Sequence, residues 1–291
     1  MIVTSISREM LLHVVKTLPA APRIMSQLGH LLLDPNSDMG EITDLLRRDT
    51  ALTARIIRIS NSAFYNTGAP TGSLDEALAR VGYTEVYRLV GLAAVAQMSD
   101  HALPLYGTSG ACARENALLT ALIIENLADA AQLDPRVAYT AGLLRSVGKI
   151  ALDRLTPNGP GSLRYRGRES GRLGDWEFDH LGVNNCDAAA TILREWRFPT
   201  ATVEAIRDHY LRARTASPFA QLLNLAAGAA ERGGHPFPGE TDYWVSLPLA
   251  SGPLEIGEQE LSDALFRALE HFGPLREAIA ATTAVEKQHV G

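Results

Sequence analysis

Cysteines are scarce in this sequence, and long runs of apolar residues are absent. Cys112 and Cys186 are the only cysteines in 291 residues, too few for the disulfide framework of a secreted protein. No window approaches the 18 uninterrupted apolar residues of a membrane-spanning helix. The N-terminus has no basic cluster ahead of an apolar run, so a signal peptide is not indicated. We therefore expect a cytoplasmic protein with no membrane partner.

An excess of basic charge is also missing. The formal net charge is −6; residues 1–107 carry 9 basic and 10 acidic side chains, and the remainder carries 18 and 23. Non-specific binding to nucleic acid requires a basic field, so we expect no nucleic-acid partner. The length and the 46% hydrophobic content are typical of a soluble globular protein that is large enough for two lobes.

Helical periodicity dominates the sequence, and no segment shows the alternation typical of a strand, which predicts an all-α fold. N-cap residues indicate helix starts at Asp49, Ser73, Asp134 and Ser217, the last two ahead of proline, and another helix is expected to begin at Thr84. Gly82 and Gly148 are expected near helix ends. Apolar residues with helical spacing follow three of these starts: Leu52, Ile56, Ile59 and Ala63; Val86, Leu89, Val90 and Ala93; Leu222, Leu225, Ala226 and Ala229.

Two stretches lack periodicity. Residues 156–174 contain five glycines and four arginines, which predicts a mobile loop. Residues 233–257 are rich in glycine and proline, yet they include Tyr243-Trp244-Val245, which we expect to pack onto another element. We place a helical N-terminal lobe at 1–107, a second helical lobe at 108–282 and a frayed tail at 283–291.

An ordered series of motifs resembles the HDOD family, the HD-related output domains of bacterial signalling proteins. The resemblance covers roughly residues 10–230. Its motifs are Leu18-Pro-Ala-Ala-Pro22, Asp49–Arg55, Asn61-Ser-Ala-Phe-Tyr65, Ser73–Ala77, Val81-Gly82, Ala141–Leu152, Leu181-Gly-Val183, Leu193–Pro199 and Ala205–Tyr210.

The resemblance implies a small helical lobe and a larger lobe built like the HD phosphohydrolases. It also implies a signalling role, in which such domains act as regulatory outputs and sometimes follow a phospho-receiver domain, as in response regulators. Since this chain starts directly at the HDOD segment, we expect any phosphorylation input to come from another protein.

The metal ligands of an HD site are degenerate in this sequence. In HD hydrolases a helix reads Leu-Leu-His-Asp-(Ile/Val)-Gly-Lys, and here the His-Asp pair is replaced by Arg145 and Ser146. A guanidinium has no acceptor and stays protonated, so it cannot bind a cation. By the same resemblance, the first His falls at about Glu115 and a later His falls on Asn185, while His209 matches a remaining ligand. We predict no metal, no cofactor and no catalytic activity.

Three interpretations of the altered pocket remain open. Arg145 forms an internal ion pair, with Glu115 nearby, and fills the vacated site. Alternatively, Arg145 and Lys149, one helical turn apart, hold an anionic ligand such as a nucleotide phosphate. The third interpretation is a divergent metal-dependent phosphohydrolase acting on a nucleotide or cyclic dinucleotide.

Outside this pocket, the aromatic motif at residues 61–65 is the strongest candidate for a partner surface. We interpret Asn61 as the end of a helix, and Phe64 and Tyr65 as core residues at the lobe junction or as a contact for a partner. Cys112 and Cys186 show no Cys-His arrangement in the sequence, so we interpret them as packing residues. The sequence therefore predicts a non-catalytic regulatory protein that binds another signalling protein; its oligomeric state stays open.

Overall fold

The computed structural model describes residues 5–18, 21–34, 36–62, 64–65, 68–98, 101–156, 162–211, 215–245 and 254–289. Two compact units make up the chain. The larger unit comprises Met1–Leu18 and His101–Leu269, and the smaller unit comprises Pro19–Asp100 and Glu270–Gly291.

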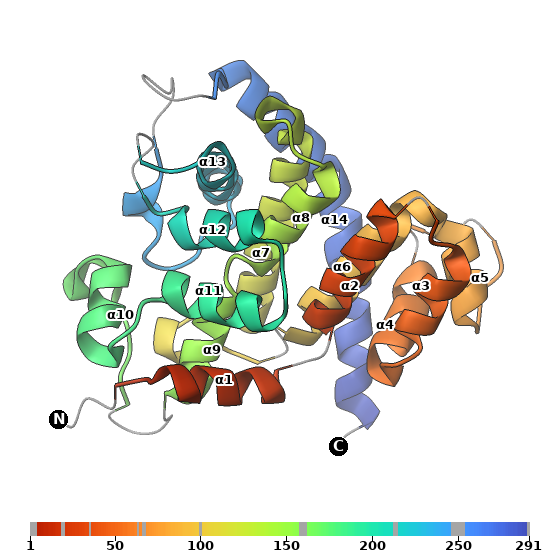
Figure 1. Ribbon diagram of the computed structural model, residues 1–291, viewed down its shortest axis with the longest axis horizontal. Coiled ribbons are helices and arrows are strands. Elements are labelled where there is room, and N and C mark those ends of the chain that lie inside the picture. Colours follow the sequence, from red (N-terminus) through yellow and green to blue (C-terminus); the bar gives the residue numbers. More distant parts are fainter. Residues whose placement is uncertain are drawn as a thin grey trace. The chain divides into compact units, whose positions relative to one another are not determined.

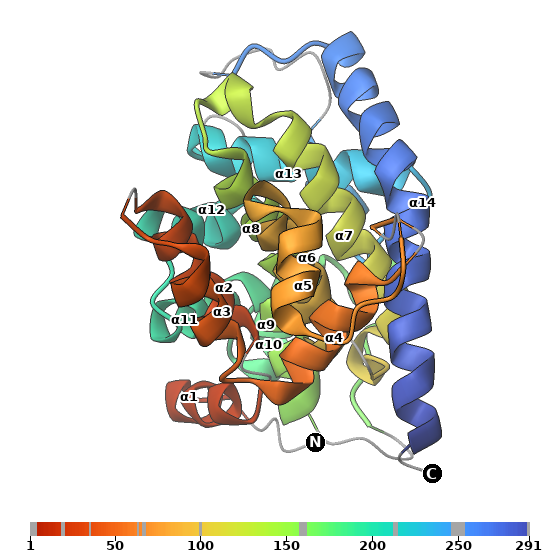
Figure 2. The same cartoon turned by 90° about the vertical axis from the view of Figure 1, so that its right-hand side faces the viewer.

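The larger unit is a set of packed helices (Figures 1 and 2). The helix α7 packs against α8 and α13, α11 packs against α9 and α12, and α1 packs against α9 and α11. Their bounds are α1 (Arg8–Thr17), α7 (Gly110–Asn126), α8 (Pro135–Leu144), α9 (Val147–Leu155), α10 (Leu173–Leu181), α11 (Asn185–Glu195), α12 (Thr200–Asp208), α13 (Pro218–Arg232) and the first part of α14 (Glu258–His289).

Helices of the smaller unit are also packed on one another. In this unit α6 contacts α2, α4 and α5, and α3 contacts α2 and α5. Their bounds are α2 (Ala21–Leu33), α3 (Met39–Leu46), α4 (Thr50–Ser60), α5 (Leu74–Val81) and α6 (Tyr83–Met98).

The all-α fold is confirmed: the described residues contain helices, turns and one isolated bridge between Leu103 and Thr108, but no strand. Each predicted N-cap side chain accepts a hydrogen bond from the first turn of its helix, as expected for Asp49, Ser73, Asp134 and Ser217. Gly82 ends α5 with a φ of 78°, a conformation that glycine adopts without strain. The described residues of the three predicted apolar stripes are buried, and Ala63 lies outside the described residues.

Three helix boundaries differ from prediction. The helix that starts at Pro135 ends at Leu144, and Gly148 lies in the first turn of α9 rather than near a helix end. The helix expected from Thr84 begins one residue earlier, at Tyr83. The tail predicted from 283 is helical, since α14 continues to His289.

The division into units also differs from the predicted lobes. Residues 5–18 belong to the larger unit because α1 packs on α9 and α11, and because the Ile6 amide donates to the Leu181 carbonyl at 2.7 Å. The second boundary falls between Asp100 and His101, a few residues before the predicted one, and the third falls within α14. Contacts between distant segments of the chain decide these boundaries, and local composition does not report them.

Parts of the two irregular stretches are held by packed aromatic side chains. In the first stretch Tyr165 is 4% exposed and packs edge-on against Trp176; in the second, Tyr243 stacks on Tyr210, as expected for an aromatic that packs onto another element. Residues 157–161 and 246–253 lie outside the described residues.

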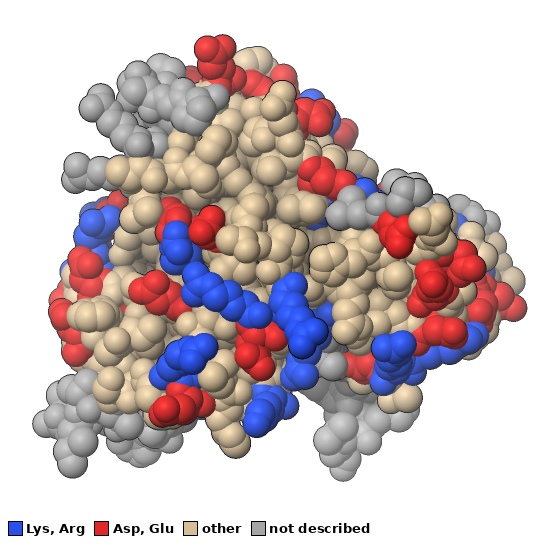
Figure 3. Space-filling model, viewed as in Figure 1, with Lys and Arg blue, Asp and Glu red and all other residues tan. Residues whose placement is uncertain are grey.

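On the face that Figure 3 shows, Lys and Arg side chains lie among Asp and Glu side chains over the described part of the chain. None of the described helices combines the length and the apolar character that crossing a membrane requires.

Candidate functional site

Arg145 and Lys149 lie at the junction of α8 and α9, in the interior of the larger unit. Arg145 and Ser146 form the turn between the two helices. Both cationic side chains have no exposed surface. Because a buried charge without a partner costs several kcal/mol, an anion is required at this junction.

Glu240 supplies that anion. Its carboxylate accepts two hydrogen bonds from the Arg145 guanidinium, from Nη1 to Oε1 at 2.7 Å and from Nη2 to Oε2 at 2.8 Å. Lys149 Nζ also donates to Oε1, and the Tyr210 hydroxyl donates to Oε1 at 2.6 Å. This paired arrangement of guanidinium and carboxylate is the strongest geometry available to an ion pair. The four residues form what we call the Glu240 cluster.

Polar and aromatic side chains enclose the Glu240 cluster. Asn116 Oδ1 accepts from Arg145 Nη2, while Asn116 Nδ2 donates to the His235 carbonyl at 2.7 Å. The Phe237 ring centre lies 4.4 Å from Lys149 Nζ, and the Trp244 ring centre lies 5.7 Å from Arg145 Cζ. Aromatic faces stabilise both cations where water is excluded.

The electrostatics of the Glu240 cluster follow from burial and pairing. Burial opposes the charge on Glu240, but Arg145 and Lys149 hold the pKa of its carboxyl well below the ordinary value. Burial lowers the pKa of Lys149, and Glu240 only partly offsets this effect. Burial also raises the pKa of the Tyr210 hydroxyl well above 10.0, so this group stays a donor. The geometry thus sets two cations against one carboxylate.

A short irregular segment, residues 235–245, carries Glu240 to the cluster. Gly239 has a φ of 85°, and a Cβ at this position would lie 2.5 Å from the Tyr165 ring, so both the backbone conformation and the close approach require glycine. The 3₁₀-helix η4 (Thr241–Tyr243) follows directly. Its Tyr243 ring stacks on Tyr210 with the ring centres 4.0 Å apart.

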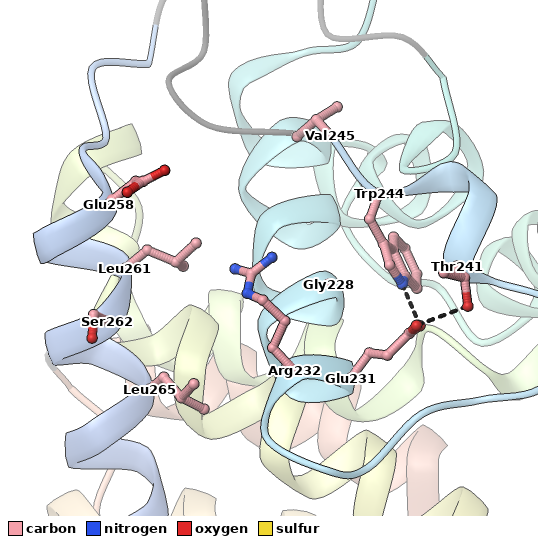
Figure 4. Close-up of a pocket in the computed structure, with 10 residues that line it drawn as sticks. All are labelled: Gly228, Glu231, Arg232, Thr241, Trp244, Val245, Glu258, Leu261, Ser262 and Leu265. Atoms are coloured by element: carbon pink, nitrogen blue, oxygen red, sulfur yellow. Dashed lines mark hydrogen bonds between the residues drawn. The ribbon is translucent and has the colours of Figure 1, made fainter.

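Glu231 of α13 fixes the end of this segment. Its carboxylate accepts from the Trp244 indole at 2.6 Å and from the Thr241 hydroxyl at 2.7 Å, as Figure 4 shows. The same residues border a cavity of about 650 Å³, into which the Arg232 side chain points. Glu231 therefore holds the segment that contains Glu240 in place.

The prediction that Glu115 is the ion-pair partner of Arg145 was wrong, because Glu240 has that place. Glu115 points away from the cluster and pairs with His235, whose Nδ1 lies 3.2 Å from Glu115 Oε2, and 28% of the Glu115 side chain is exposed. The next residue, Asn116, is fully buried and contacts Arg145. A shift of one residue on α7 turns the side chain by about 100°, which moves it from the interior to the boundary of the unit.

Asn185 belongs to a second buried network. Its backbone amide and its Nδ2 both donate to Glu177 Oε2 at 2.7 Å, and Tyr106 donates to Glu177 Oε1 at 2.8 Å. Burial raises the pKa of Glu177, although these three donors counteract the effect. Asn185 therefore holds a buried carboxylate in place. The Ser146 hydroxyl is buried without a hydrogen-bond partner among the described residues.

His209 is buried and electrically neutral. Its Nδ1 donates to the Ile206 carbonyl at 2.7 Å, and its Nε2 has no partner among the described residues. Burial, together with Arg145 and Lys149, lowers the pKa of His209 to about 3. The imidazole remains uncharged at neutral pH.

A Cys-His contact that the sequence does not reveal also lies here. Cys186 Sγ is 3.9 Å from His209 Nδ1. Burial raises the pKa of the Cys186 thiol, and the Nδ1 proton of His209 is bonded to a carbonyl. A nucleophilic cysteine requires a thiolate, so the packing role expected for Cys186 agrees with this geometry.

The residues at this position do not fit a metal centre of the HD type. A metal site needs clustered carboxylate and imidazole ligands, and in the described part of the chain no three His, Cys, Asp or Glu side chains come together in this way. Glu240, the carboxylate that is present, is bonded to two cations that would repel a metal ion.

The aromatic motif lies in the smaller unit. The Asn61 side chain bridges to a loop, since its Nδ2 donates to the Thr71 carbonyl and its Oδ1 accepts from the Thr71 amide, both at 2.8 Å. Phe64 packs edge-on against Tyr65 and against His271. Both aromatic rings are half-buried, and Asn61 has a structural role.

A family model for the HDOD domain matches residues 18–211, more than half of the sequence. The chain belongs to the HDOD family. No curated protein matches it with significance.

Solved structures with the same fold include two that the chain covers almost completely. One is an HDOD domain protein of unknown function from Geobacter sulfurreducens, with 20% identity, a TM-score of 0.58, and coverage of 97% of this chain and 95% of that one. The other, from Shewanella amazonensis, is named as a candidate phosphohydrolase, with 22% identity, a TM-score of 0.63, and coverage of 94% and 98%. A candidate signal transduction protein from Marinobacter aquaeolei has 20% identity and a TM-score of 0.56, with coverage of 92% of this chain and 58% of that one. At these identities the likeness establishes the HDOD fold.

Three residues of these networks, Glu240, Asn116 and Glu177, were not predicted from the sequence. Glu240 lies in a Pro- and Gly-rich stretch without periodicity, so no pattern marked it as buried. For Glu177, its spacing of four residues from Leu173 and Leu181 on a short helix was the available signal.

Proposed function

We propose that this HDOD protein is a non-catalytic regulator in a signalling system and that it acts by binding another protein. The Glu240 cluster is the observation that carries the proposal. Where the motif of the resembling hydrolases has its metal-binding His-Asp pair, this chain has Arg145 and Ser146, and the Arg145 guanidinium is paired with the Glu240 carboxylate. Phosphoester hydrolysis at such a site needs a metal-activated water, which these residues do not support.

Exposed apolar side chains support an interaction with another protein. Phe178 is 60% exposed and Leu211 is 46% exposed. Both line one surface cavity of about 530 Å³, together with the half-buried Tyr210 and Tyr243. Single exposed apolar residues are common, but here they share one cavity with two tyrosines, and charged side chains such as Arg172, Asp175 and Arg207 line the same cavity. Apolar groups bordered by polar ones are typical of contact surfaces.

Affinity capture tests the interaction. The tagged chain is used as bait in lysate of its native cell, beside the variants Phe64→Ala, Phe178→Ala and Phe266→Ala. Phe266 is 65% exposed and does not line this cavity, so it is the matched control for Phe178. We expect one protein that the wild type and Phe266→Ala retain and that Phe178→Ala or Phe64→Ala loses. Equal loss with all three variants would indicate non-specific adsorption and would contradict the proposal.

A second candidate function, sensing of a small anion, is favoured by one observation. The cluster contains two cations and a single carboxylate. The hydrolase interpretation lacks an observation of this kind, and one tightly bound iron, manganese or zinc ion per chain would restore it.

A further inference from the structure

The Glu240 cluster has the donor arrangement of an oxyanion-binding site. Four hydrogen bonds from three side chains converge on the two oxygens of one carboxylate. A guanidinium that donates through both Nη atoms, with an ammonium and a hydroxyl beside it, suits a phosphate as well as a carboxylate. Arg145 Nε is a further donor that is buried without a partner among the described residues.

The charge of the cluster favours an anion with more than one negative charge. Arg145 and Lys149 carry two positive charges, and Glu240 carries one negative charge. Burial keeps the neighbouring Tyr210 hydroxyl and Cys186 thiol protonated, so neither adds a negative charge. The Glu177 carboxylate accepts its hydrogen bonds from Tyr106 and Asn185. A phosphate dianion would balance the two cations more completely than a carboxylate does.

The segment that carries Glu240 borders two cavities. The cavity of about 650 Å³ is lined by Thr241, Trp244 and Val245 of this segment (Figure 4). Tyr243 of the same segment lines the cavity of about 530 Å³. Segments that are not packed on all sides open at a lower cost in free energy than core helices do.

We propose that Glu240 is a built-in anion in an oxyanion site, and that a small ligand with a phosphate monoester or free phosphate group replaces it and releases residues 237–245. This inference rests on the proposed function, because it assigns the altered pocket to ligand sensing instead of catalysis. Release of this segment would alter the wall of the cavity that contains Phe178 and would thereby couple the ligand to the contact surface.

Phosphate rescue of a Glu240→Ala variant tests the site. This variant leaves two buried cations and a space where the carboxylate was. Wild type, Glu240→Ala, Arg145→Met/Glu240→Ala and Glu231→Ala are refolded and melted in inorganic phosphate, in adenosine monophosphate, or in sodium chloride of equal ionic strength. Glu231 is the matched control, because it is a carboxylate of the same region that bonds neutral donors.

We expect phosphate at millimolar concentration to raise the melting temperature of Glu240→Ala, or to restore its folding, in a saturable manner. Arg145→Met/Glu240→Ala and Glu231→Ala should respond no more than in chloride. A greater effect of adenosine monophosphate would identify a phosphate monoester as the ligand, and an equal effect would identify free phosphate. The oxyanion site would be overturned if the folded Glu240→Ala variant showed no change in melting temperature with phosphate. It would also be overturned if the variant stayed unfolded in phosphate.

Displacement is tested on the unaltered chain by the fluorescence of Trp244. Phosphate should change its emission in a saturable manner, and this change should be lost in Trp244→Phe. Phosphate binding by Glu240→Ala without any change in the wild type would overturn the displacement. Either failure leaves the non-catalytic function standing, whereas a stoichiometric metal ion would overturn that function independently.

Discussion

At the scale of single residues, the Glu240 carboxylate is the group on which the interior of the larger unit depends. It is fully buried and accepts from Arg145, Lys149 and Tyr210. Removing one member of a buried ion pair leaves the other charge without a partner. Here the loss of Glu240 would leave two such charges.

Glu240→Ala is therefore expected to lower the free energy of unfolding by about 3–5 kcal/mol in a buffer without phosphate. Glu115→Ala is the control, because its pair with His235 is partly exposed and should contribute about 1 kcal/mol or less. Chemical denaturation of both variants measures the difference. Equal effects of the two substitutions would contradict the assignment of Glu240 as the partner of Arg145.

Asp153 is a second residue whose charge has a measurable consequence. It is 5% exposed, its Oδ1 accepts from the Leu105 amide at 2.8 Å, and burial raises its pKa to about 6. An unfolded aspartate has a pKa of about 4, so between these pH values the native state binds more protons than the unfolded state. The contribution of Asp153 to the free energy of unfolding is therefore fully present below about pH 4 and is lost as the pH rises through about 6.

Asp153→Asn should remove this component, because an amide oxygen still accepts from Leu105 but carries no charge. We expect the melting temperature of the variant, relative to the wild type, to rise between pH 4 and pH 6 and then to stay level. Melting curves measured from pH 4 to pH 8 check the slope. A difference that is independent of pH would show that Asp153 does not titrate in this range.

At the scale of helices, the sequence predicted starts better than ends. The starts at Asp49, Ser73, Asp134 and Ser217 depend on side chains that bond their own first turn, so local sequence contains the signal. The break at Arg145-Ser146 depends on contacts with other helices and was not predicted. Glu240 also escaped prediction because its burial arises from a partner 95 residues away.

Gly148 lies where α9 and α11 approach most closely. A Cβ at this position would lie 1.9 Å from the Asn185 carbonyl oxygen and 2.8 Å from the Ala189 amide nitrogen, so α9 and α11 are in backbone contact here. The glycine that was expected to end a helix instead allows two helices to meet.

Gly148→Ala should cost about 3 kcal/mol or more in stability, because backbone atoms must move to admit the methyl group. Gly29→Ala on α2 is the matched control: no atom lies within 4 Å of its added Cβ, so the substitution should stabilise by about 1 kcal/mol through helix propensity. Denaturant unfolding of the two variants gives both values. A mild effect of Gly148→Ala would mean that α9 and α11 are not in close contact.

At the scale of the whole molecule, the sequence predicted the fold class and the family but not the division of the chain. The ordered motifs were sufficient for the HDOD assignment, and the family model agrees over residues 18–211. The position of residues 5–18 in the larger unit depends on α1 packing against α9 and α11. The sequence alone does not predict this contact, because the helices that meet in it lie far apart in the chain.

The proposal that the Glu240 cluster stands in place of a metal centre is tested most directly by metal analysis. The chain is produced with iron, manganese and zinc in the medium, dialysed against a chelator and measured by inductively coupled plasma mass spectrometry, with phosphodiesterase activity assayed in parallel. We predict far less than one metal ion per chain and no hydrolysis above the buffer blank. About one metal ion per chain that survives dialysis, accompanied by hydrolysis that Arg145→Met changes, would contradict the assignment of Arg145, Lys149 and Glu240 as an internal ion pair in place of a catalytic site.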